Sequence, residues 1–229
     1  MSRGAAPVRL RLQPLDRVWE EVAALGLDWL SDDEHVRLAG IGSERSRQRF
    51  LAGHWLAREA IAGHAGGLAR DWRLENPDKG KPVAVYRDGH AGPAFSLSHS
   101  GHWLGCAVGP EPMGLDLEQP TRARDVLALA RLACSDAERA LLEALDDAPR
   151  TECFYRLWTL KEAWAKRDGR GIAPARLRAT NFAPSPPEVA VARTWQGEGL
   201  WVALAAEQVA HVELPAEPAL TETGAWRPG

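Results

Sequence analysis

At 229 residues, with 45% hydrophobic and 26% charged residues, the chain has the composition of a globular protein large enough to bury a core. The formal net charge of only −3 excludes the global basic field that draws proteins onto nucleic acid, so no nucleic-acid partner is expected. Three widely spaced cysteines, Cys106, Cys134 and Cys153, predict buried, reduced thiols and argue against a disulfide framework or a zinc site.

The start of the chain carries no targeting signal that we can identify. Residues 1–15 mix arginine, proline and glutamine with short apolar pieces, unlike the continuous apolar region of a signal peptide. The sequence contains no run of 18 apolar residues, so no transmembrane helix and no membrane partner are expected. A cytoplasmic location is therefore predicted.

The first half of the chain predicts helices followed by strands. A capping box at 31–34 starts a helix that runs toward residue 39, and a longer helix is expected over 44–62. The turn Gly80-Lys81-Pro82 leads into an apolar run at 83–86. Alternating or apolar runs at 95–98, 103–108 and 113–118 then predict a sheet.

The second half predicts the same two kinds of element. Helices are expected over 125–133, from a second capping box at 135–138, and over 152–167, and strands at 189–192 and 200–205. Trp55-Leu56-Ala57-Arg58-Glu59-Ala60 is echoed by Trp158-Thr159-Leu160-Lys161-Glu162-Ala163, each on a predicted helix. We therefore predict an α+β fold of two pseudo-repeated halves, 1–110 and 111–229, with the active site at their junction.

Two carboxylates lie on one face of the strand predicted at 113–118. Alternation sends Leu115 and Leu117 to one side and Asp116 and Glu118 to the other. Side chains two residues apart can converge on one hard cation, and Mg²⁺ accepts one or two carboxylates together with water and phosphate. The alternative is the exposed polar face of an edge strand, which is the more common meaning of a lone Asp-x-Glu.

The helix predicted at 152–167 adds a third carboxylate. Cys153, Leu157, Leu160 and Trp164 form one stripe, which we assign to the core, and Tyr155, Thr159, Glu162 and Lys166 form the opposite stripe. Glu162 and Lys166 can be an ordinary surface ion pair one helical turn apart. In the functional interpretation, Glu162 is a metal ligand or a base and Lys166 contacts phosphate.

A small turn rich in hydroxyl groups follows the strand at 95–98. Ser98-His99-Ser100-Gly101 lacks the Gly-x-Ser-x-Gly pattern of a hydrolase nucleophile. Its hydroxyls, backbone N–H groups and imidazole are suited to holding phosphate. His99 can equally be a structural histidine whose ring is satisfied by neighbouring groups.

In order along the chain, these motifs resemble those of the 4'-phosphopantetheinyl transferases. The resemblance rests on Phe95–Ser100, Gly114–Glu118, Trp158–Lys166 and Gly169-Arg170-Gly171-Ile172, with weaker support from 31–58 and Gly80-Lys81-Pro82. The length is similar to that of the monomeric, surfactin-synthetase-activating type, which consists of two pseudo-repeated halves. Arg170 replaces a more usual lysine and keeps its charge.

The resemblance implies Mg²⁺-dependent transfer of phosphopantetheine from coenzyme A to a serine of an acyl or peptidyl carrier protein, with release of 3',5'-ADP. It assigns Asp116, Glu118 and Glu162 to the metal, with Glu162 also the candidate base and Lys166 neutralising the leaving phosphate. The remaining contacts to coenzyme A would come from Arg37, Arg49, Lys81, Ser98 and His99.

One residue departs from the family pattern. Glu34 lies where relatives often have a basic residue for the 3'-phosphate, so Arg37 and its neighbours are expected to take over that role.

The acceptor should be an acidic, helical carrier protein. A docking surface with cationic and apolar side chains is one interpretation of Arg122, Arg124, Val126, Leu127, Leu129 and Arg131. An ordinary amphipathic helix with solvated arginines is the other.

Two other classes remain open from the sequence. A metal-dependent nuclease or phosphatase could use the same three carboxylates, although it would not need Gly80-Lys81-Pro82 or the Ser98-His99 turn. The other alternative is a coenzyme A-binding protein without turnover. The presence of all three acidic residues argues against it, because a relative that had lost catalysis would be expected to lose its metal ligands first. The pathway that the carrier protein serves cannot be read from the sequence.

Overall fold

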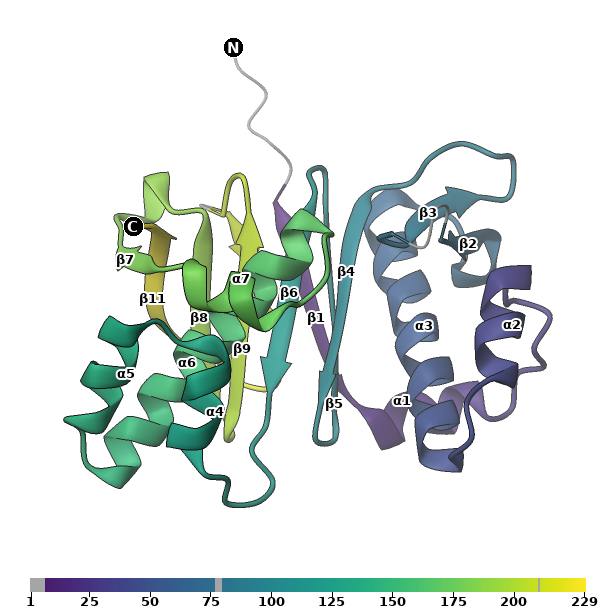
Figure 1. Cartoon of the computed structure of the whole chain (residues 1–229). Coiled ribbons are helices and arrows are strands. Elements are labelled where there is room, and N and C mark those ends of the chain that lie inside the picture. Colours follow the sequence, from purple (N-terminus) through teal and green to yellow (C-terminus); the bar gives the residue numbers. More distant parts are fainter. Residues whose placement is uncertain (1–6, 77–79, 210) are drawn as a thin grey trace, which may run out of the picture.

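A computed structural model describes residues 7–76, 80–209 and 211–229. Residues 1–6, which are part of the segment 1–15 that lacks a predicted signal peptide, lie outside the described residues. Two β-sheets lie next to each other in the middle of the molecule, and helices cover their outer sides (Figure 1). The α+β prediction is confirmed. Among the helices of the described part, none is long and apolar enough to cross a membrane.

The first sheet has four strands in the order β10-β1-β5-β4. Its bounds are β1 Val8–Pro14, β4 Ala94–Ser100, β5 Trp103–Gly109 and β10 Val212–Glu213. β5 pairs antiparallel with both β1 and β4, whereas β10 joins β1 in parallel. A strand from the end of the chain thus extends the sheet of the first half. The division at residue 110 stays a prediction.

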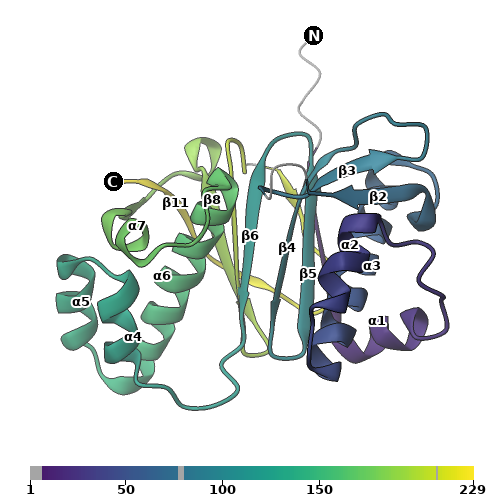
Figure 2. The same cartoon turned by 45° about the vertical axis from the view of Figure 1, so that its right-hand side comes forward.

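Helices cover the outer face of this sheet (Figure 2). α3 Glu44–Ala65 packs on β5 and β4, and α1 Leu15–Val22 packs on α3. α2 Asp32–Ala39 lies farther out, beyond α3 (Figure 1), and the short 3-10 turn η1 Ala69–Asp71 follows α3. A small hairpin of β2 Trp72–Glu75 and β3 Val83–Tyr86 packs beside them. α3 buries Leu51, Leu56 and Ile61 in the core of the first half, and Phe50 and Trp55 are partly buried against it.

The second sheet has five strands in the order β6-β9-β8-β11-β7. They are β6 Met113–Glu118, β7 Phe182–Pro184, β8 Ala192–Gly197, β9 Leu200–Ala206 and β11 Thr221–Pro228. The strand predicted at 189–192 is wrong: residues 187–189 form the 3-10 turn η3 Pro187–Val189, and β8 begins only at Ala192. Two consecutive prolines before Glu188 favour the turn.

Four helices flank the second sheet: α4 Val126–Ala133, α5 Asp136–Glu143, α6 Asp147–Asp168 and α7 Pro174–Ala179. α6 packs along β6 and β9. The stripe of α6 opposite the predicted core stripe is itself partly buried, because Tyr155 and Thr159 are buried as well as Leu157 and Leu160. Other helices cover the side of α6 that does not face the sheet, so both stripes meet protein.

Both halves contain a long helix on a sheet, α3 on the first and α6 on the second, which agrees with the pseudo-repeat. The repeat itself stays a prediction. All three cysteines are buried and free, as expected.

The two sheets meet where β4 lies beside β6 (Figure 2). Strand alternation sends Phe95 and Leu97 of β4 toward the helices of the first half. The opposite side of β4 carries Ser96, Ser98 and Ser100, and it faces β6. The junction of the halves is therefore lined by hydroxyl groups on one strand and by the Asp116–Glu118 segment on the other.

Candidate active site

Three carboxylates converge at the junction. Asp116 and Glu118 come from β6 and Glu162 from α6, and one ligand atom from each lies within 4.8 Å of the other two. Leu115 and Leu117 point the other way into the core, as alternation predicts. The cluster that the sequence placed on two separate elements is thus assembled in space.

Gly114 allows this assembly. A Cβ at this position would overlap the backbone carbonyl oxygen of Ala163 and the backbone nitrogen of Arg167, so only glycine lets α6 lie this close to β6. The close approach brings Glu162, one residue before Ala163, over the carboxylates of the strand. The requirement is for space, since Gly114 has no positive φ.

Asp116 is almost fully buried, and its two oxygens differ. Oδ1 accepts from Lys166 Nζ at 2.6 Å and from Ser98 Oγ at 3.1 Å. Oδ2 is buried and has no hydrogen-bond partner among the described residues. A buried carboxylate oxygen without a partner is costly, and a cation in the cluster would satisfy it.

Burial and mutual repulsion shift the pKa values of two of the carboxyl groups. Burial raises the pKa of Asp116 to about 6, although Lys166 partly opposes the shift. Burial and the neighbouring Asp116 raise the pKa of Glu162 to about 7. The raised pKa values mean that burial and the neighbouring carboxylates disfavour the charged forms of Asp116 and Glu162. A hard divalent cation such as Mg²⁺ would stabilise these charged forms and would satisfy the partnerless oxygen of Asp116.

A cavity of about 790 Å³ opens from the carboxylates toward α2 and α3. Three cationic side chains line it together with the cluster: Arg37, Arg49 and Lys166. His99 lines it as well, and desolvation in the cavity and the charges of Arg49 and Lys166 lower its pKa. Carboxylates at one end and cations along the walls suit a ligand with several phosphate groups and a bound metal.

The remaining two residues assigned to coenzyme A are already engaged with protein. Lys81 Nζ donates to the carbonyl oxygens of Met113 at 2.9 Å and Arg167 at 2.6 Å, and its side chain lines a smaller neighbouring cavity of about 250 Å³. Ser98 Oγ accepts from Lys166 Nζ at 3.0 Å. Lys81 therefore links the start of β6 to the end of α6, a connection that the sequence analysis did not foresee.

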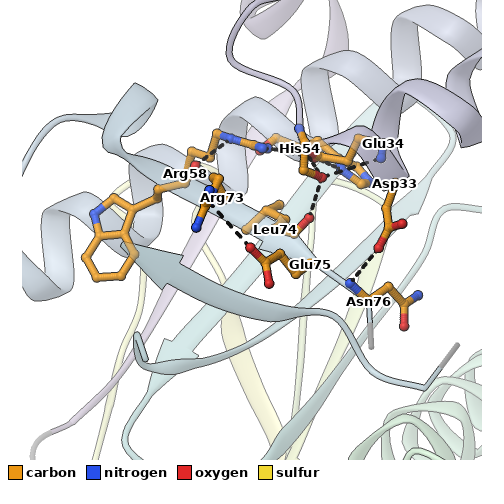
Figure 3. A network of polar contacts seen from close by, with 10 residues as sticks. Asp33, Glu34, His54, Arg58, Arg73, Leu74, Glu75 and Asn76 are labelled. Atoms are coloured by element: carbon orange, nitrogen blue, oxygen red, sulfur yellow. Dashed lines mark hydrogen bonds and ion pairs between the residues drawn. The ribbon is translucent and has the colours of Figure 1, made fainter. Parts of the chain in front are cut away.

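Glu34 lies in the protein interior and does not line the cavity, and its carboxylate is held in a network of polar contacts (Figure 3). Arg58 holds both of its oxygens, with Nη1 at 2.8 Å from Oε1 and Nη2 at 2.5 Å from Oε2, and His54 Nδ1 lies 2.5 Å from Oε1. Ser31 completes the capping box with its backbone N–H at 2.7 Å from Oε2. Glu34 thus ties α2 to α3, whereas Arg37, one turn further along α2, lines the cavity.

Two residues were missed by the sequence analysis. His54 lines the cavity while its Nδ1 is held by Glu34, and an isolated histidine on a helix gave no sign of this. Ser100 Oγ donates to Glu118 Oε2 at 3.0 Å, and its position two residues after Ser98 on an alternating strand could have indicated it.

The predicted docking residues differ in exposure. The arginines Arg122, Arg124 and Arg131 are exposed. Val126 is largely buried among the helices of the second half, although it lines the same cavity as Arg122 and Arg124, and Leu127 and Leu129 are half-buried against the same cluster. The docking role of these residues stays a prediction. Arg122 and Arg124 line a cavity of about 410 Å³ together with Tyr155.

Comparisons with known proteins find the family that the sequence motifs resemble. A family model described as the 4'-phosphopantetheinyl transferase superfamily matches residues 112–209. The 4'-phosphopantetheinyl transferase HetI of Nostoc sp. is 33% identical over 182 residues, which cover 79% of this chain and 76% of HetI. The 4'-phosphopantetheinyl transferase Sfp of Bacillus subtilis is 29% identical over 64% of this chain and 63% of its own length. The 4'-phosphopantetheinyl transferase psf-1 of Bacillus pumilus is 39% identical over 55% of this chain and 52% of its own.

Proposed function

This chain belongs to the 4'-phosphopantetheinyl transferase superfamily, and on that premise we propose that it transfers the 4'-phosphopantetheine group from coenzyme A to a serine of an apo carrier protein. The observation that carries the proposal is the cluster of Asp116, Glu118 and Glu162 at the end of a cavity whose walls are cationic.

The cluster would hold Mg²⁺ through the three carboxylates. Bound there, the ion would neutralise charge on the pyrophosphate of coenzyme A and so lower the barrier to its cleavage. The partnerless Oδ2 of Asp116 is the atom most in need of such a ligand. Lys166, which already reaches Asp116, would stabilise the phosphate that leaves with 3',5'-ADP.

The other cationic groups have roles that follow from their places. Arg37 of α2 and Arg49 of α3 line the cavity and suit the 3'-phosphate of the nucleotide. His99 feels the charges of both Arg49 and Lys166, and Ser98 contacts Lys166, so both suit the pyrophosphate. Lys81 would contribute mainly by fixing β6 against α6, with one ammonium proton left for the nucleotide.

Glu162 is the candidate for the general base, acting directly or through a water molecule. In the transfer, the serine oxygen forms a bond to the phosphorus that carries the pantetheine, and the bond from that phosphorus to the bridging oxygen breaks. The serine proton must pass to a base, and Glu162, which lines the cavity beside the other two carboxylates, is placed to accept it.

The carrier protein would approach beside the loop that follows β6. The exposed Arg122, Arg124 and Arg131 offer charges complementary to an acidic helix, and Leu127 and Leu129 expose only part of their apolar surface. The chain would act as a monomer, with its site between residues 1–110 and 111–229.

The test is incubation with Mg²⁺, coenzyme A and several apo carrier proteins, followed by mass spectrometry of the carriers. The proposal predicts addition of one phosphopantetheine group per carrier and stoichiometric release of 3',5'-ADP. Release of 3',5'-ADP without a carrier adduct would favour a hydrolase, and neither product with any carrier would refute the proposal.

A further inference from the structure

The sheets are joined at β4 and β6 through side-chain hydroxyls. The backbone N–H groups of β6 and the residue after it donate to serines of β4: Leu115 to Ser96 at 2.9 Å, Leu117 to Ser98 at 3.2 Å, and Gln119 to Ser100 at 2.9 Å. Each hydroxyl takes the place that a backbone carbonyl would have in a continuous sheet. The spacing of two residues puts all three serines on the face that meets β6.

The hydroxyl protons of two of these serines reach the carboxylate cluster. A serine hydroxyl has one proton, so a hydroxyl that accepts from an N–H group can still donate once. Ser100 donates to Glu118 Oε2 at 3.0 Å, and Ser98 donates to Asp116 Oδ1 at 3.1 Å. Ser96 has no carboxylate partner among the described residues.

The turn after Ser100 is itself held against the end of β6. Gly101 has a φ of +59°, and a Cβ there would overlap the side chain of Gln119. The side-chain oxygen of Gln119 accepts the backbone N–H of His102 at 3.2 Å. Ser100 is therefore fixed on both sides, which makes it a rigid support for the carboxylate that it contacts.

We propose that Ser100 is a positioning residue that orients Glu118 toward the cation. The proposal rests on the proposed function, because the orientation matters only if the cluster binds a metal. Glu118 is half-buried on a long side chain that can adopt several rotamers. With Oε2 held by Ser100, Oε1 has no hydrogen-bond partner among the described residues and remains for the metal.

Ser100 belongs to the first half of the chain and Glu118 to the second. The hydroxyl contact therefore makes the metal site depend on how the two halves are joined. Ser98 has a similar place at Asp116, but it also contacts Lys166, so Ser100 gives the clearer test.

The experiment measures Mn²⁺ binding by electron paramagnetic resonance, with coenzyme A present and no carrier protein, so that no turnover occurs. Ser100→Ala should raise the Kd for Mn²⁺ roughly 10-fold or more, as loss of a group that supports a metal ligand commonly does. Ser100→Thr keeps the hydroxyl and should restore most of the affinity. Ser96→Ala removes the same kind of strand contact without touching a carboxylate, and it should leave the Kd within about 2-fold, with comparable loss of thermal stability.

The outcomes separate this proposal from the proposed function. If wild type binds Mn²⁺ and Ser100→Ala binds it equally well, the role of Ser100 is refuted and the function stands. An equal loss of affinity in Ser96→Ala would show general loosening of the junction and would also refute the role. No Mn²⁺ binding by wild type would refute both. Should Ser100→Ala not fold, Ser100→Thr and Ser100→Val, which match in shape and differ in the hydroxyl, provide the same comparison.

Discussion

At the scale of single residues, the position and burial of a carboxyl group decide whether it can ligate a metal or accept a proton. Glu162 combines a raised pKa with a place between Asp116 and Glu118, whereas Glu152, near the start of the same helix, is exposed to water. Only the first of these carboxylates is placed to ligate a metal or accept a proton.

Glu162→Gln should therefore reduce the initial rate of carrier modification by about 100-fold or more, because an amide neither accepts the proton nor ligates the metal as well. The rate is measured by mass spectrometry at saturating coenzyme A. Glu152→Gln is the matched control and should leave the rate unchanged. Full activity of Glu162→Gln would exclude Glu162 as ligand and base.

The lowered pKa of Glu34 predicts how the stability of the fold changes as the pH falls. Burial alone would raise its pKa, but hydrogen bonds and charges from His54 and Arg58 outweigh burial and lower the pKa to about 2 from its usual 4.5. A carboxyl group with a lowered pKa stabilises the fold above the usual value, and this stabilisation is lost as the pH falls toward the folded value.

The stability advantage of wild type over Glu34→Gln should thus shrink between pH 6 and pH 3.5, by on the order of 1 kcal/mol from linkage. Urea unfolding of both proteins at the two pH values measures it. A difference in unfolding free energy that does not change with pH would mean that Glu34 is not held in its charged form by Arg58.

Residue patterns foretold part of this site. Alternation placed Asp116 and Glu118 together, and the helical register placed Glu162 and Lys166 one turn apart. The partners of Glu34, which are His54 and Arg58, and those of Lys81, which are Met113 and Arg167, lie 20 or more residues away along the chain. No local pattern reports such contacts, because they depend on how the elements pack.

At the scale of elements, the site depends on how closely α6 approaches β6. The sequence located both elements, although α6 begins at Asp147, earlier than predicted, since a residue such as Pro149 is tolerated in the first turn of a helix. The distance between the elements was not predictable, because Gly114 reads in the sequence as an ordinary strand glycine.

Gly114→Ala should push α6 away from β6, because the added methyl overlaps the backbone at Ala163. We expect a loss of about 1–3 kcal/mol in stability and weaker Mg²⁺ binding, since Glu162 moves with the helix. Denaturant unfolding and metal titration measure the two effects.

Gly53→Ala is the control on α3, where the nearest heavy atom outside the helix backbone lies 4.0 Å from the added Cβ. It should be neutral or stabilise the protein by about 0.5–1 kcal/mol, because alanine favours a helix interior. A stable Gly114→Ala variant with unchanged metal affinity would show that the close contact does not set the site.

At the scale of the whole molecule, the halves are interlocked. β10, near the end of the chain, pairs with β1 at its start, and Leu10 and Leu12 of β1 pack in one core with Leu115 and Leu117 of β6. The sequence predicted two α+β halves from an internal echo, but β1, α1 and β11 were not predicted. The apolar residues of these segments lie in short runs mixed with polar residues, and their order depends on distant contacts: β1 pairs with β5, β11 pairs with β8, and α1 packs on α3.

The carboxylates of the site come from two elements. β6, which carries Asp116 and Glu118, lies beside the serines of β4, and α6, which carries Glu162, packs on β6 at the same junction. The proposed reaction requires that this junction hold a divalent metal. Crystals of the protein grown with Mn²⁺ and coenzyme A would test it by anomalous diffraction. We predict a peak within coordination distance of carboxylate oxygens from Asp116, Glu118 and Glu162. A peak elsewhere, or none at this cluster, would contradict the account.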